Sequence, residues 1–183
     1  DVAVLSLGDV VISSSVKNAG DKFDEAIVKY VRRKHNALIG DRTAEEIKRT
    51  VGCVYPRSEE AIMEVRGRCL MTGLPRTFTV SSSEILDALE EVSSAIVEAV
   101  HWVLERTPPE LTGDISANGI TMTGGGSLIW GFDKLIASKT GIPTRVADEA
   151  VSCVAYGTGN CLENLSKMQD GTMNLSRQRQ MKR

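Results

Sequence analysis

The sequence predicts an α/β fold in which a mixed sheet is flanked by helices. Three observations predict it. The chain opens with two apolar strand patterns joined by a Gly-Asp turn. Long segments then carry apolar residues at three- and four-residue spacing, which is typical of helices that cover a sheet. Finally, an apolar run at 120–123 meets three consecutive glycines and is followed by another helical pattern.

The composition is that of an ordinary globular protein. Of the 183 residues, 42% are hydrophobic and 25% are charged, and the formal net charge is −2, so we expect no nucleic-acid partner. The four cysteines lack a C-x-x-C spacing and the two histidines are far apart, so we expect no zinc or other metal site. This cysteine pattern is best explained by reduced thiols in a cytoplasmic protein. A Cys-His nucleophilic pair is the alternative, although no motif indicates one.

The first fifty residues predict a hairpin and two helices. Residues 1–16 form the hairpin, and the apolar residues on both of its faces suggest a sheet covered by helices. A helix follows Gly20, with Asp21 or Asp24 as its cap. Its apolar face comprises Phe23, Ile27, Tyr30 and Val31. A second helix begins at 41–43, where Thr43 and Glu46 predict a capping box.

Residues 53–80 change character. The segments 63–67 and 76–80 alternate like exposed strands, and a Gly-Leu-Pro break separates them. We interpret 53–80 as the core of a small inserted subdomain and leave open its extension into the helix of residues 82–106. The larger subdomain then comprises residues 1–52 and 81–165.

The second half predicts a long helix, two short strands and two further helices. The long helix opens at Ser82 or Ser83 and ends at the Thr-Pro-Pro run that starts at Thr107. Its successors are a strand at 120–123, a helix at 130–140, a strand at 144–147 and a last helix at about 151–165.

The end of the chain carries two further signals. Three small residues in the last helix, Ala155, Gly157 and Gly159, predict close packing against a neighbouring element. Residues 166–183 hold five basic residues against one Asp and lack hydrophobic periodicity. We predict a disordered tail there, with a weak contact to an anionic surface or a partner as the alternative.

The glycine run, Gly124 to Gly126, indicates a possible ligand loop. Glycines at a strand end let a ligand approach the backbone, and a following helix can present its positive end to a nucleotide. The run is neither a Walker loop nor a dinucleotide G-x-G-x-x-G motif. Taken alone, a tight turn without a ligand is as good an interpretation.

Several blocks of the sequence resemble the bacterial actin MreB family. They include A-G-D-K-F-D-E-A-I at 19–27, L-I-G-D-R-T-A-E-E-I-K at 38–48, E-V-R-G-R at 64–68, T-P-P-E-L at 107–111, T-G-G-G-S-L at 123–128, T-G-I-P at 140–143 and C-V-A-Y-G-T-G at 153–159. Because they cover about residues 1–165 in unbroken order, the chain is identified as a member of that family.

The resemblance implies an actin-like ATPase fold of the ribonuclease H-like type, and filaments under the inner membrane that direct rod cell shape and cell-wall synthesis. ATP or ADP with Mg²⁺ would bind in a cleft between two related domains. The implied partners are further filament subunits, the cell-wall elongation machinery and the inner membrane. The alternatives are a heat-shock-type chaperone or a sugar kinase of the same fold, and an interaction module that binds no nucleotide.

The resemblance also implies a set of nucleotide-binding residues. The loop of Gly124, Gly125, Gly126 and Ser127 would lie against the adenosine and the α-phosphate, and Glu45 and Lys48 would approach the ribose and the adenine. The i, i+3 spacing puts Glu45 and Lys48 on one helix face, where a carboxylate can accept from ribose hydroxyls and a lysine stem can cover a base. The alternative for this pair is a surface salt bridge worth about 0.3–0.5 kcal/mol. Asp21 is a weaker candidate.

The sequence departs from the family pattern at its start. Asp1 matches the acidic residue that follows the family's D-I-G-G-G-T-T phosphate loop. We therefore expect a C-terminal half that lacks both loops for the terminal phosphates, and we assign no catalytic residue. Such a half should not hydrolyse ATP efficiently, because phosphoryl transfer requires the γ-phosphate, metal and water to be positioned together. It should bind nucleotide weakly and self-associate.

Overall fold

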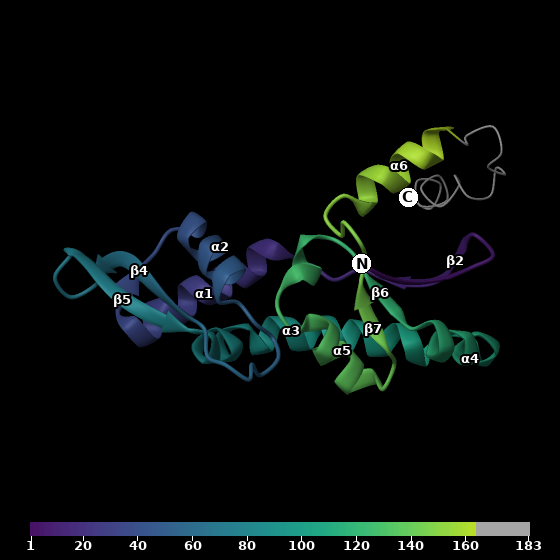
Figure 1. The fold of residues 1–183 in the computed structure, drawn as a ribbon, viewed down its shortest axis with the longest axis horizontal. Coiled ribbons are helices and arrows are strands. Elements are labelled where there is room, and N and C mark those ends of the chain that lie inside the picture. Colours follow the sequence, from purple (N-terminus) through teal and green to yellow (C-terminus); the bar gives the residue numbers. More distant parts are fainter. Residues whose placement is uncertain (164–183) are drawn as a thin grey trace, which may run out of the picture.

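The longest helix connects two groups of elements. The computed structural model describes residues 1–163. In it, α3 (Ser82–Glu105) runs along the middle of an elongated molecule, with one group packed around its first half and the other around its second half (Figure 1).

The first group combines two helices with a three-stranded antiparallel sheet. The helices are α1 (Gly20–His35) and α2 (Asp41–Thr50), and the sheet order is β3 (Ala37–Leu38), β4 (Ile62–Cys69), β5 (Pro75–Ser81). The strands predicted within 53–80 are therefore confirmed. The sheet also takes β3 from outside that range, and the division of the chain at residues 53 and 80 stays a prediction.

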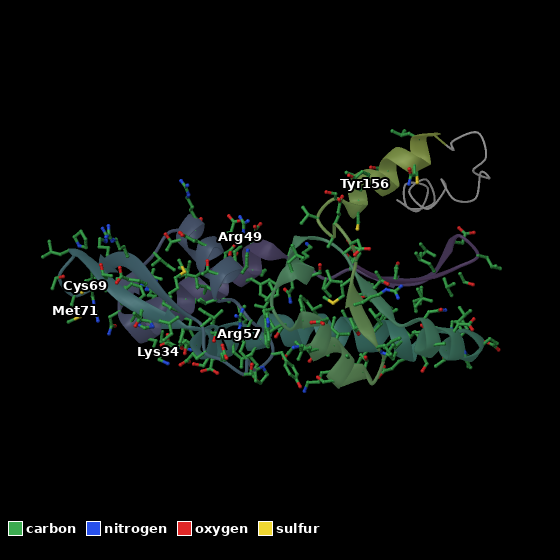
Figure 2. All side chains as sticks on the ribbon, in the orientation of Figure 1. Lys34, Arg49, Arg57, Cys69, Met71 and Tyr156 are labelled. Atoms are coloured by element: carbon green, nitrogen blue, oxygen red, sulfur yellow. The ribbon has the colours of Figure 1, made fainter. Side chains whose placement is uncertain are left out.

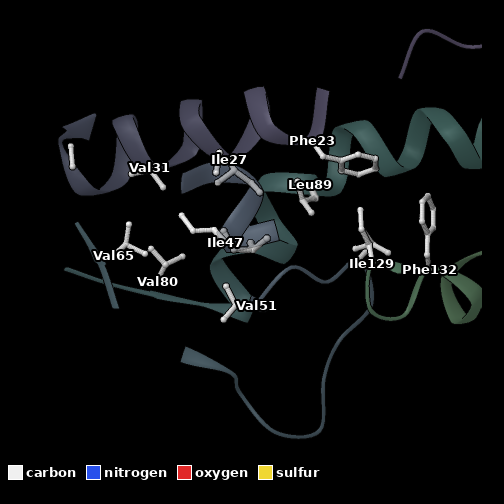
Figure 3. Close-up of a cluster of buried hydrophobic side chains, with 14 of the residues drawn as sticks. Phe23, Ile27, Val31, Ile47, Val51, Val65, Val80, Leu89, Ile129 and Phe132 are labelled. Carbon is white, nitrogen blue, oxygen red and sulfur yellow. The ribbon is translucent and has the colours of Figure 1, made fainter. Parts of the chain in front are cut away.

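The core of this group is formed where α1, α2 and α3 meet the sheet (Figure 3). The predicted apolar face of α1 is buried, which confirms its period. Among the fully buried side chains are Phe23, Ile27, Val31, Ile47, Val51, Val80, Ile85 and Leu89. The ring of Phe23 also meets that of Phe132, edge to face at 6.3 Å, so the core continues into the second group.

The second group contains two two-stranded sheets. In the order of the chain it comprises β1 (Val2–Ser6), β2 (Asp9–Ser14), α4 (Pro109–Asn118), β6 (Ile120–Met122), the 3₁₀ turn η1 (Gly125–Leu128), α5 (Phe132–Thr140), β7 (Thr144–Val146) and α6 (Cys153–Glu163). Strands β1 and β2 are antiparallel, and β6 and β7 are parallel.

The predicted helix caps are wrong. The N-cap positions of α1 and α2 are Ala19 and Gly40, and neither helix has a side-chain cap. A capping box is formed at α3 instead, where the Ser81 hydroxyl accepts from the Glu84 backbone N–H and the Glu84 carboxylate accepts from the Ser81 N–H at 2.9 Å. Serine caps a helix as well as Asp does, so composition alone did not choose between the sites.

Two features of the second half differ from the prediction. Helix α4 was not predicted, because the two prolines were used only as the end of α3. Pro109 begins α4, where its missing N–H and fixed φ suit the first helical turn. Helix α5 begins at Phe132, two residues after its predicted start at 130, and η1 occupies part of the segment between the glycine run and this helix.

Two elements leave apolar surface exposed. Helix α3 packs on the β1–β2 hairpin, but Leu5 and Leu7 are exposed, so the described residues cover only one face of the hairpin. In α6, a Cβ added to Gly157 or Gly159 would meet no atom within 4 Å, so the packing predicted from the small residues is not formed by residues 1–163. The predicted tail at 166–183 lies outside the described residues.

Candidate functional site

A cavity of about 690 Å³ opens between the two groups. It lies where α2 and the first residue of α1 approach the glycine turn. Its lining residues are Gly20, Glu45, Lys48, Arg49, Gly52, Arg57, Gly125, Gly126, Leu128, Ile129, Trp130 and Val151. Four of the six predicted site residues, Glu45, Lys48, Gly125 and Gly126, are thus brought together from distant parts of the chain.

Helix α2 directs Glu45 and Lys48 to the cavity because the adjacent face of the helix is held in the core. Ala44 and Ile47 are fully buried, and the remaining side of the helix carries the charged residues. Glu45 is exposed and Lys48 is half-buried. The predicted common face of this pair is therefore the face that lines the cavity.

Lys48 is paired with Asp24 rather than with Glu45. Its Nζ lies 2.8 Å and 2.9 Å from the two carboxylate oxygens of Asp24, and it donates to the Gly20 carbonyl at 3.3 Å. The side chains of Lys48 and Asp24 are only 14% and 16% exposed. A simple Glu45–Lys48 salt bridge is not formed among the described residues, so the Glu45 carboxylate stays available to a ligand.

Gly124 and Ser127 shape the turn instead of lining the cavity. Gly124 has a φ of 84°, which favours glycine, and its N–H donates to the Ala150 carbonyl at 2.7 Å. The Ser127 hydroxyl donates to the Gly124 carbonyl at 2.6 Å, and Ser127 is 5% exposed. These hydrogen bonds fix the conformation of the turn. Direct contact of Gly124 and Ser127 with a nucleotide stays a prediction.

Gly125 and Gly126 face open space. Neither has a positive φ, and a Cβ built on either would meet no atom within 4 Å. Neither the backbone conformation nor internal packing therefore requires glycine at these positions. Because both residues line the cavity, a side chain there would project into the space available to a ligand.

Several lining residues of the cavity were not predicted, and two of them, Arg57 and Trp130, lie against each other. The carbonyl of Trp130 accepts from the Val54 N–H at 3.1 Å, and the Arg57 guanidinium lies 4.8 Å from the centroid of the Trp130 ring. No local pattern marks this pair, since it forms only when the loop after α2 folds against the segment after η1. Gly52 permits that fold, because a Cβ there would lie 2.0 Å from the Lys48 carbonyl.

The cavity has an uneven charge. Arg49 and Arg57 bring positive charge, Lys48 is already paired, and Glu45 brings one carboxylate (Figure 2 labels Arg49 and Arg57). Within residues 1–163 no group of three or more His, Cys, Asp or Glu could hold a metal ion, and no helix is long and apolar enough to cross a membrane. Open backbone, a carboxylate and cations together suit a polar, partly anionic ligand.

Comparison with known proteins decides the family. The family model described as MreB/Mbl protein matches residues 1–170. The chain belongs to the MreB/Mbl family. It is 52% identical over 168 residues to the cell shape-determining protein Mbl of Bacillus cereus, covering 92% of this chain and 50% of that protein. It is 53% identical over 163 residues to the cell shape-determining protein MreB of Escherichia coli K12, covering 89% and 47%. The chain thus spans about half the length of these MreB/Mbl relatives.

Solved structures confirm the actin-like α/β fold. Crystal structures of MreB5 of Spiroplasma citri, bound to ADP and to AMPPNP, match with a TM-score of 0.86 at 41% identity, covering 90% of this chain and 50% of that one. A MamK double helical filament matches at a TM-score of 0.63 and 19% identity, covering 78% of this chain and 46% of that one, and supports the fold alone. Membership in the MreB/Mbl family takes precedence over the chaperone and sugar-kinase alternatives.

Proposed function

We propose that this chain forms one wall of an adenine-nucleotide cleft in a filament-forming MreB/Mbl protein. In the longer protein, ATP or ADP with Mg²⁺ binds in the cleft, and the filaments lie at the inner face of the membrane, where they direct rod cell shape with the cell-wall elongation machinery.

One observation carries the proposal. The cavity joins Glu45 and Lys48 on α2 to the open backbone of Gly125 and Gly126, although these segments are far apart in the chain. Glu45 can accept hydrogen bonds from ribose hydroxyls, and the glycines leave room for a nucleotide to approach the main chain. The nucleotide complexes of the 41% identical MreB5 support the same ligand class.

The direct test is ADP binding by calorimetry with a matched pair of variants. Glu45→Ala removes a carboxylate from the cavity lining, whereas Glu46→Ala removes an exposed carboxylate from the next position of α2, outside the lining. We expect Glu45→Ala to weaken binding about tenfold, the size of one lost charge-assisted hydrogen bond, and Glu46→Ala to bind normally. Equal affinities for all three proteins would refute the site.

The filament part of the proposal needs the longer protein. Sedimentation of the full-length parent with ATP should give a pellet that Glu45→Ala reduces and Glu46→Ala does not. A pellet that is independent of ATP, or is the same for both variants, would disconnect assembly from this cavity.

A further inference from the structure

We propose that Arg57, seated against Trp130, is a further ligand-binding residue of the cavity and contacts the nucleoside part of a bound nucleotide. This inference rests on the function proposed above and extends it to a residue that neither the sequence patterns nor the family resemblance marked. Three features of Arg57 carry it: its anchoring, its unused donors and its place in the cavity.

Arg57 and Trp130 are both fixed by the backbone. Arg57 Nη2 donates to the Gly52 carbonyl at 3.2 Å. Trp130 is held by the Val54 hydrogen bond at 3.1 Å and by a parallel bridge to Cys53. Lys134 Nζ also lies 4.6 Å from the centroid of the Trp130 ring. A guanidinium held in this way is ordered before a ligand arrives, which lowers the entropy lost on binding.

Arg57 has donors to spare. A guanidinium has five N–H donors, no acceptor and a permanent charge. Its Nε is buried and forms no hydrogen bond within the described residues, which also form no ion pair to Arg57. Burial raises the pKa of the Cys53 thiol, and the charge of Arg57 together with a hydrogen bond from its side chain partly offsets that rise. Because Nε is closed to solvent, a ligand with hydrogen-bond acceptors would bind at the terminal nitrogens of Arg57, of which Nη2 already donates to Gly52.

The neighbours of Arg57 favour the nucleoside over the phosphates. Arg57 lies with the indole of Trp130, and Leu128 and Ile129 precede Trp130 in the same lining, so this part of the cavity combines a planar cation with apolar side chains. Lys48 is instead tied by a hydrogen bond to Gly20 at the positive end of α1. The family resemblance places Lys48 near the ribose and the adenine, whereas this position beside a helix N-terminus suits a phosphate. A purine presents a flat apolar face and edge acceptors, which complement Trp130 and Arg57 together.

The test compares adenosine with ADP, by calorimetry on the full-length parent of this chain. Arg57→Met keeps the length of the stem and removes the donors. Arg106→Met is a matched control, because Arg106 also lies over a tryptophan, 4.2 Å from the centroid of Trp102, outside the cavity lining. We expect Arg57→Met to weaken adenosine and ADP by the same factor, about tenfold, and Arg106→Met to change neither. Circular dichroism checks that each variant is folded.

A second substitution at the same position distinguishes a loss of ligand contacts from a loss of folded protein. Arg57→Lys retains the charge but loses the planar set of donors, so we expect it to weaken adenosine binding as well. Full adenosine affinity in Arg57→Lys or Arg57→Met would overturn the inference, and so would a loss confined to ADP, which would place Arg57 at a phosphate. If the wild-type full-length parent binds neither ligand, the proposed function fails and this inference with it. If the wild type binds and Arg57→Met binds equally, only the inference fails.

Discussion

Gly125→Ala tests whether glycine is needed at this position for the backbone and its packing or for the approach of a ligand. Gly125 lines the cavity, has no positive φ and has no atom within 4 Å of an added Cβ. At such a position, alanine raises the free energy of unfolding by about 0.4–1 kcal/mol, because it reduces the entropy of the unfolded chain. The added methyl group would nevertheless stand where a ligand meets the backbone. We expect ADP affinity to fall tenfold or more, about 1.4 kcal/mol or above.

Gly52→Ala is the matched control for this substitution. Its Cβ would lie 2.0 Å from the Lys48 carbonyl, so α2 or the following loop must shift. We expect the free energy of unfolding to fall by about 1–3 kcal/mol, as for other overpacked sites. The two alanine variants therefore should move stability in opposite directions.

Urea unfolding followed by circular dichroism measures the first quantity, and calorimetric titration with ADP measures the second. A Gly125→Ala protein that is less stable than the wild type would show that the space beside Gly125 is filled. A Gly125→Ala protein that binds ADP as the wild type does would show that the nucleotide does not approach this backbone, and the proposed site would be wrong.

Two further predictions concern the ion pairs around the cavity and the α3 cap. Asp24→Ala leaves the 14%-exposed Lys48 ammonium without its carboxylate and should lower the free energy of unfolding by about 1–2 kcal/mol in urea, whereas Asp21→Ala on the same helix should change it little. Burial raises the pKa of Glu84, but the Ser81 N–H, Lys34 and His35 outweigh it, so this pKa lies below its usual value. The ionised Glu84 carboxylate therefore stabilises the fold above the unfolded-state pKa of about 4.3, and this stabilisation is lost as the pH falls through the lower pKa of the folded state. Glu84→Gln should reduce the dependence of the free energy of unfolding on pH below about pH 4.3. An unchanged acid transition in Glu84→Gln would contradict this role.

The helices could be predicted from the sequence where apolar residues recur at helical spacing and are buried in the core. The face of Phe23, Ile27 and Val31 is read directly from their spacing, and it is the face that the structure buries. The caps were not predictable, because several Ser, Thr and Asp residues compete near each helix start and tertiary contacts choose among them. Asp24 shows this, since its carboxylate binds Lys48 of another helix instead of capping its own.

The site was predictable in part for the same reason. Glu45 and Lys48 lie on one face of a helix whose register is set by Ile47, so their shared exposure to the cavity follows from spacing. The contact of Arg57 with Trp130 depends on a loop that folds across the chain, and no local pattern encodes it.

The sequence by itself determined the family, the α/β class, the faces of the main helices and the glycine run as a ligand-loop candidate, because each depends on residue order or on a short period. The tertiary structure decided which glycines matter and why. Gly124 bends the turn, while Gly125 and Gly126 open onto a cavity. It also decided that Lys48 is held by Asp24 and that Arg57 joins the lining, because these contacts exist only once distant segments pack together.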